Sequence, residues 1–154
     1  MSRRDAVVVL AVDGPNILRD EFSLDLDEIR EHARGYGQLA VASVYLDDGA
    51  PSGLIRAAEA RGYRVVTTSG DVDVRLAVEV THRIATAPCD TLIIVSRDTD
   101  FKPVIEQANA AGIHTVAIAP GTHGRSDALR HAAAEALVLD PRGADRPRFV
   151  GYDP

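Results

Sequence analysis

The sequence has very little lysine, cysteine or tryptophan, and it has no hydrophobic run long enough to cross a bilayer. Its 154 residues include one lysine, Lys102, one cysteine, Cys89, and no tryptophan. A lone cysteine excludes an intramolecular disulfide and a Cys-rich zinc site. The longest apolar runs, AVVVLAV and TLIIV, are far shorter than the roughly 20 residues of a membrane-spanning helix. Asp13 follows the first run where a secretory signal needs small residues, so we expect a cytoplasmic protein without a membrane anchor.

Charge and composition narrow the function classes. Acidic residues number 23 and basic residues 17, for a net charge of −6, and all basic residues except Lys102 are arginine. Such a chain lacks the basic stripe of a typical duplex-DNA-binding protein. An enzyme that holds phosphates through carboxylate-bound metal ions remains compatible with this charge. The content of 45% hydrophobic and 26% charged residues is that of a globular protein, and the length fits one domain.

Hydrophobic patterning alternates between strands and helices. Apolar runs predict strands at residues 6–12, 38–46, 63–68, 91–95, 114–119 and 136–139. Helical periodicity and capping residues predict helices from 23 or 25 to about 34, and at 51–62, 71–87, 101–111 and 126–135. The alternation predicts an α/β fold, a three-layer sandwich with a central, mainly parallel sheet. We expect one domain over residues 1–140 and a loosely held, Pro- and Gly-rich tail over 141–154.

Acidic residues follow the predicted strands at the edge where α/β sheets bind ligands. Asp13 ends the first strand, Asp98 and Asp100 follow the fourth, and the helix after the third begins with Asp71 and Asp73 and carries Glu79. If the first and fourth strands flank the point where strand order reverses, Asp13, Asp98 and Asp100 converge there. Clustered carboxylates need a cation or a raised pKa. Mg²⁺ or Mn²⁺ suits oxygen ligands, and either ion supports phosphodiester hydrolysis.

Each acidic position also has a purely structural interpretation. Asp98 can be a helix N-cap, and Asp100 then occupies the first turn, where the helix dipole favours acids. Asp13 can belong to a plain turn, Asn16 can bond its own backbone, and Asp73 can face solvent. The coincidence of all these positions at one sheet edge favours a functional site.

Other motifs give weaker signals. The sequence contains no GxGxxG, no Walker A motif and no GxSxG, so it lacks the phosphate loops of dinucleotide and P-loop proteins and the elbow of serine hydrolases. The loop over residues 120–126 leads into a predicted helix whose first N–H groups can bind phosphate, with Arg125 and Ser126 as candidate contacts. An ordinary turn explains the same loop equally well.

Four segments occur in the order of a known family: VDGPNILRDEF, TTSGDVDVRLAVEV, VSRDTDFKPVIEQANAAGIHTVAIAP and SDALRHAAAEALVL. They resemble the motifs of the NYN domain, which belongs to the PIN-like nuclease superfamily. The resemblance covers roughly residues 6–140, and it is strongest to a prokaryotic subgroup with DGPN, GDVDVRLA and RDxDF. It implies an α/β sandwich with a parallel sheet, acidic residues that bind Mg²⁺ or Mn²⁺, and cleavage of RNA.

The resemblance also assigns individual residues. Asp13 matches the first metal-site aspartate of the family, and Asn16 the polar residue beside it. Asp73 matches the acid of the middle motif. Asp98 and Asp100 match the acids after the fourth strand, with Asp98 the first ligand of that pair.

Three positions depart from the family pattern. Arg97 replaces a glycine of many members, although the subgroup shares the arginine. Ser69 replaces a lysine and so removes a phosphate contact, and Ala134 stands where many members have a late aspartate.

The leading hypothesis is a Mg²⁺- or Mn²⁺-dependent endoribonuclease with RNA as its partner. Its catalytic residues are Asp13, Asp98 and Asp100, with Asp73 as a further metal ligand. The candidate substrate contacts are Asn16, Arg97, Lys102, Arg125 and Ser126. The alternative is a non-catalytic, metal- and RNA-binding regulatory module. A phosphatase fits less well because the first strand lacks Asp-x-Asp, and the oligomeric state, including a homodimer, stays open.

Overall fold

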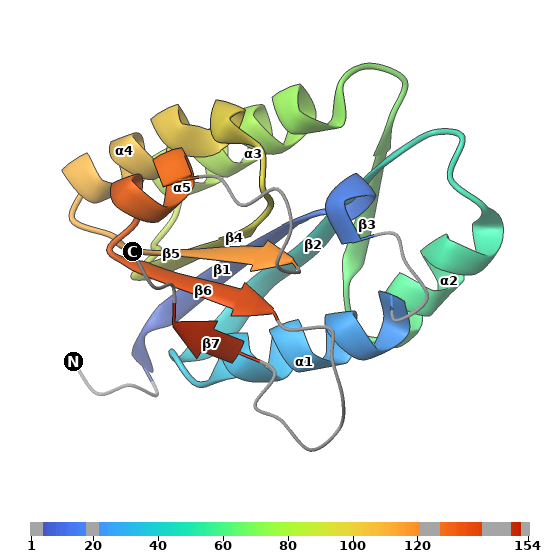
Figure 1. Ribbon diagram of the computed structural model, residues 1–154, viewed down its shortest axis with the longest axis horizontal. Helices are drawn as coiled ribbons and strands as arrows, with labels where there is room; N and C mark the ends of the chain where they lie inside the picture. Colours follow the sequence, from blue (N-terminus) through green and yellow to red (C-terminus); the bar gives the residue numbers. More distant parts are fainter. Residues whose placement is uncertain (1–4, 18–21, 121–126, 140–148, 152–154) are drawn as a thin grey trace.

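The chain folds into one seven-stranded sheet between two layers of helices (Figure 1). The computed structural model describes residues 5–17, 22–120, 127–139 and 149–151. The strands are β1 (Val7–Asp13), β2 (Gln38–Asp47), β3 (Arg64–Thr68), β4 (Thr91–Val95), β5 (His114–Pro120), β6 (Glu135–Leu139) and β7 (Phe149–Gly151). The helices are α1 (Phe22–Arg34), α2 (Ser52–Ala60), α3 (Val72–Thr86), α4 (Lys102–Ala110) and α5 (Asp127–Ala132), with short 3-10 helices η2 (Gly14–Ile17) and η3 (Thr99–Phe101).

The strand order is β3-β2-β1-β4-β5-β6-β7, and every pair except the last is parallel. The predicted fold class, a three-layer α/β sandwich with a mainly parallel sheet, is therefore confirmed. Chain order reverses between β1 and β4, so ligands are expected beyond the carboxyl ends of these two central strands.

The last strand was not predicted by the sequence pattern. Residues Phe149–Gly151 pair antiparallel with Leu137–Leu139 of β6, inside the segment that we expected to be loosely held. A three-residue strand among prolines and glycines is too short to show the alternation by which strands are recognised.

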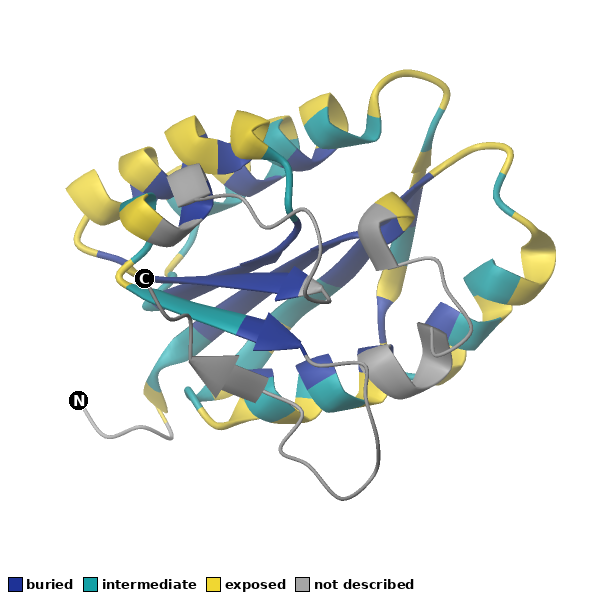
Figure 2. Cartoon of the chain, viewed as in Figure 1, coloured by how far each residue is buried: buried dark blue, intermediate teal, exposed yellow. Residues whose placement is uncertain are grey.

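The continuous apolar run of β1 is explained by helices on both faces of the sheet. Val8, Leu10 and Val12 pack toward α1 and α2, whereas Val9 and Ala11 pack toward α3, α4 and α5. Figure 2 shows these central strands buried between the two helical layers. Among the helices of the described residues, none combines the length and the hydropathy of a membrane span.

The helix predicted over 101–111 begins differently from the expectation. A 3-10 turn, η3, precedes α4, and the last residue of that turn, Phe101, is fully buried in the core between the sheet and α3–α5. The α5 helix is also shorter than the predicted 126–135, since it ends at Ala132. Phe101 therefore fixes the η3 segment, which carries Asp98 and Asp100 at its start, to the hydrophobic core.

We expect Phe101→Ala to lower the free energy of unfolding by about 3–5 kcal/mol, because it removes a fully buried aromatic side chain and leaves a cavity. Urea unfolding followed by circular dichroism measures the change. Val74→Ala is the matched control, since Val74 is largely exposed and its truncation should change stability by no more than about 0.5 kcal/mol. Equal losses in the two variants would contradict an anchoring role for Phe101.

Candidate metal centre

The two central strands bring Asp13 and Ser96 together. Parallel pairing sets Val12 of β1 beside Val95 of β4, so the next residue on each strand lies at the shared carboxyl edge. Ser96 Oγ donates a hydrogen bond of 2.8 Å to Asp13 Oδ2, and both side chains are buried. A buried carboxylate requires such partners, because an unpaired charge in the interior is costly. The orientation of Asp13 is therefore set by the residue after β4, a strand that is next to β1 in the sheet but far from it in the sequence.

The same serine also holds the loop that carries the next two acids. Ser96 Oγ accepts a hydrogen bond of 3.0 Å from the backbone N–H of Asp98. Asp98 Oδ1 in turn accepts one of 2.9 Å from the backbone N–H of Asp100. The interpretation of Asp98 as an N-cap is thus correct, here for η3. Capping uses Oδ1, so it does not exclude a second role for the other carboxylate oxygen.

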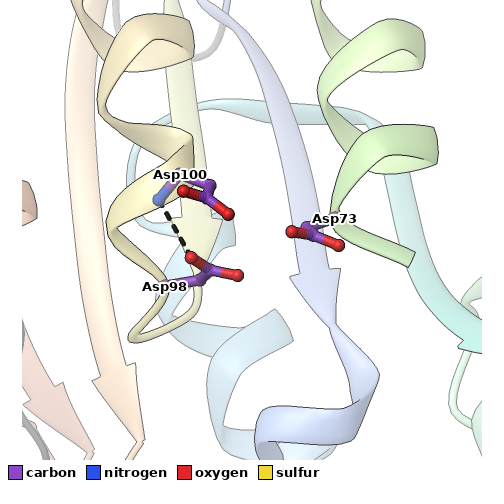
Figure 3. Close-up of side chains that lie close together, drawn as sticks. All are labelled: Asp73, Asp98 and Asp100. Atoms are coloured by element: carbon purple, nitrogen blue, oxygen red, sulfur yellow. Dashed lines mark hydrogen bonds between the residues drawn. The ribbon is translucent and has the colours of Figure 1, made fainter. Parts of the chain in front are cut away.

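Three carboxylates from two separate parts of the chain face one another at this edge. Asp73 in the first turn of α3, Asp98 and Asp100 each offer an oxygen, and these oxygens lie within 4.8 Å of one another (Figure 3). Two oxygens on opposite sides of one Mg²⁺ are about 4 Å apart, so small side-chain rotations would place all three on a single ion. The donor set, entirely carboxylate oxygen and partly exposed to water, fits Mg²⁺ or Mn²⁺.

The electrostatics of the cluster favour a cation. The charge of Asp98, burial and the charge of Asp73, in that order, raise the pKa of the Asp100 carboxyl above its ordinary value. A raised pKa in an exposed aspartate means that its neighbours disfavour ionisation. A bound divalent cation would reverse that balance, because its two positive charges would offset two of the three negative charges.

Not every predicted site residue belongs to this cluster. Asp13 is not a member of the three-carboxylate set among the described residues, and it is connected to the cluster through Ser96. Arg97 lies partly buried between Ser96 and Asp98, and Lys102 is exposed at the first position of α4. The remaining substrate contacts predicted from the sequence fall on the side chain of Asn16 and on Arg125 and Ser126, which lie outside what the structure describes.

Glu79, an acid on the same helix as Asp73, points elsewhere. Its carboxylate pairs with Arg64 at 2.7 Å and Arg75 at 2.6 Å, and it accepts a hydrogen bond from the Tyr45 hydroxyl. Burial opposes its ionisation, but the two arginines prevail and hold its pKa below the ordinary value. This group therefore supports the packing of α3 on β2 and β3.

Sequence reasoning missed two residues on which the site depends. Ser96 directly follows the apolar residues of β4, and a polar residue at that position is the only sign of its role. Gly14 follows Asp13, and a Cβ there would lie 2.3 Å from Leu46 Cδ2 and 2.6 Å from the Tyr45 carbonyl oxygen. Its φ is not positive, so the requirement for glycine comes from close approach to β2 and not from a special turn.

Gly14→Ala should destabilise the fold by about 1–3 kcal/mol, because the backbone oxygen of Tyr45 cannot move aside for the added methyl group. Thermal and urea unfolding measure the loss. Gly53→Ala on α2 is the control, since a Cβ there meets no atom within 4 Å and alanine favours a helix. If both variants were equally stable, the close approach of β2 would not be what requires glycine after Asp13.

Asp100→Asn should raise the melting temperature in the presence of EDTA, because it removes one of the repelling charges. Since the pKa of Asp100 is raised in the folded state, the wild-type penalty is present where Asp100 is ionised and is relieved as the pH falls through its folded pKa. The difference between variant and wild type should therefore shrink in acid. Differential scanning calorimetry over a pH series measures it.

The same substitution should have the opposite effect once metal is added. Mn²⁺ should raise the melting temperature of the wild type, since a ligand that binds only the folded state stabilises it, and should raise that of Asp100→Asn much less. A variant that is less stable than wild type in EDTA, or that responds fully to Mn²⁺, would contradict the repulsive cluster as a metal site.

Comparisons with known proteins bear on the family and the fold of this chain. The family model of the NYN domain matches residues 7–140. An uncharacterised protein of Methanocaldococcus jannaschii is 39% identical over 132 residues, which are 86% of this chain and 55% of that protein. The chain thus spans about half the length of this curated relative. A protein of unknown function from Vibrio parahaemolyticus has the same fold, with a TM-score of 0.74 at 19% identity over 92% of this chain and 97% of the other.

Proposed function

This chain belongs to the NYN domain family, and from that premise we propose that it is a Mg²⁺- or Mn²⁺-dependent endoribonuclease. NYN domains belong to the PIN-like nuclease superfamily, which supports hydrolysis of a phosphodiester. The observation that carries the proposal is the convergence of Asp73, Asp98 and Asp100 at the carboxyl edge of the sheet, where strand order reverses. The assignment to the prokaryotic subgroup with DGPN and RDxDF remains a prediction from the sequence.

The acidic residues at this edge have different proposed roles. Asp73, Asp98 and Asp100 would hold the ion, which when bound supplies Lewis acidity and lowers the pKa of a coordinated water. Ser96 connects the buried Asp13 to this cluster, so we assign Asp13 a share of the metal site, directly or through water. Because Ser96 bonds both Asp13 and the Asp98 backbone, it sets the distance between the deepest acid and the cluster.

Basic residues near the cluster are the candidate phosphate contacts. Lys102 is exposed one residue after η3, and Arg97 directly precedes Asp98. Both can offset the negative charge that the cluster presents to a phosphodiester. Asn16, Arg125 and Ser126 are proposed as further substrate contacts from their sequence positions alone.

A non-catalytic module that binds metal and RNA is the second candidate. Ala134 stands where many family members carry a late acid, and it is exposed at the turn before β6. The net charge of −6 also disfavours tight binding of a polyanion without metal. This alternative predicts binding of metal and RNA without product.

The decisive assay incubates the protein with end-labelled single-stranded RNA in Mn²⁺, Mg²⁺ or EDTA. Asp98→Asn and Asp13→Asn should each lower cleavage by about a hundredfold or more, since even outer partners of metal ligands contribute 10–100-fold. Asp27→Asn is the matched control, because Asp27 is an exposed aspartate on the opposite helical layer. Circular dichroism should show unchanged folding in all three variants.

Three outcomes separate the candidates. Cleavage that requires metal and both aspartates supports the nuclease. Intact RNA at high protein concentration, with metal still bound, supports the non-catalytic module. Cleavage that survives both substitutions contradicts the site assignment.

A further inference from the structure

An open groove runs between α3 and α4 and begins at the acidic cluster. It has a volume of about 560 Å³, and residues of both helices line it, among them Ala77, Val78, Thr81, Pro103 and Gln107. Its walls are mainly apolar, and Val78 on its rim is 61% exposed. Val78 and the apolar walls together form an exposed apolar surface beside the acidic cluster.

The groove and the cluster share a residue. Asp100 lines the groove and also offers one of the three clustered oxygens. Asp73 lies one helical turn before Ala77, which lines the opposite wall. A nucleic acid strand with its phosphate at the cluster therefore has its neighbouring nucleotide at the mouth of this groove.

The lining favours a base over a phosphate. Among the described residues, no arginine or lysine lines the groove, and Asp100 at its end repels an anion. A nucleobase is flat and neutral, with apolar faces and polar edges. Val78, Pro103 and Val104 can cover its faces, while Thr81, His82 and Gln107 offer donors and acceptors to its edges.

We infer that the α3–α4 groove is a nucleobase subsite, which takes the base of a nucleotide next to the phosphate held at the acidic cluster. This inference rests on the proposed function and adds a substrate class to it. A base within a duplex is stacked and paired, so a subsite of this kind selects single-stranded RNA.

A protein partner is the competing occupant, and the exposed surface argues against it. A stable protein interface buries about 800 Å² on each partner. Among the described residues, the large exposed hydrophobic side chains are Val74 and Val78, both on α3. Only Val78 of these two lines the groove, and one exposed valine suits a single base better than a protein surface.

The test measures binding by fluorescence anisotropy, with Ca²⁺ in place of Mg²⁺ to suppress cleavage. The probes are a fluorescein-labelled single-stranded oligoribonucleotide and the same oligomer with abasic residues. A double variant, Val78→Ala with Gln107→Ala, should bind the base-bearing RNA about tenfold more weakly, within the range of one base contact. It should bind the abasic oligomer as the wild type does.

Val74→Ala is the matched control, since Val74 is an exposed valine on α3 outside the groove, and it should bind both probes as the wild type does. All substitutions introduce alanine at exposed helical positions, where it favours the fold. Equal binding of the base-bearing RNA by wild type and double variant overturns the inference. So does an equal loss for both probes, or an equal loss in the control.

Binding and cleavage are measured in separate assays, so the nuclease proposal and the subsite proposal can be contradicted independently. A wild type that binds RNA through the groove but never cleaves it overturns the nuclease and leaves the subsite. A wild type that cleaves RNA, with binding unchanged in the double variant, overturns only the subsite. A shift in oligomeric state on Val78→Ala, measured by light scattering, assigns the groove to a protein interface and overturns the inference.

Discussion

The parallel pairing of β1 with β4 is the constraint on which the rest of this site depends. It is the point where strand order reverses, and it sets Asp13 beside Ser96 at the end of two buried strands. The hydroxyl of Ser96 then donates to Asp13 and accepts from the backbone of Asp98. Because a hydroxyl can do both at once, a single buried side chain fixes an acid on β1 relative to a loop more than 80 residues later.

The acidic residues of the site repel one another. Clustered carboxylates raise the pKa of Asp100, so in the absence of a cation they reduce the stability of the fold. What holds them in place is packing: Phe101 is buried directly after Asp100, and Leu76 is buried one turn after Asp73. The burial of these two hydrophobic side chains therefore offsets the loss of stability that the repulsion among the acids causes. Such a conflict between function and stability is common at functional sites.

The sequence was sufficient for the layers of the fold and for the edge at which the acids gather. The buried run of β1 and the alternation of strands with helices are long-range signals that survive in a single sequence. The strand β7 was not predictable, because three residues carry no periodicity. The location of Asp73 opposite Asp98 depends on how α3 crosses the sheet, which the spacing along the chain does not determine. The family resemblance, not the pattern, singled out Asp73.

The residues whose roles were not predicted from the sequence share one property, since each role depends on a contact with a residue far away in the sequence. Gly14 is required by the approach of β2, a strand that begins more than 20 residues later, and Ser96 by contact with β1. The α3–α4 groove likewise lies between two helices that are separate in the sequence and both start near the cluster. An acidic protein cannot gain much affinity for RNA from phosphate contacts alone. On the proposed function, a metal would offset most of the charge of the cluster, and contacts to neutral bases would add to those of the few basic residues nearby. The cluster and the groove share Asp100, so the metal and the base would bind side by side.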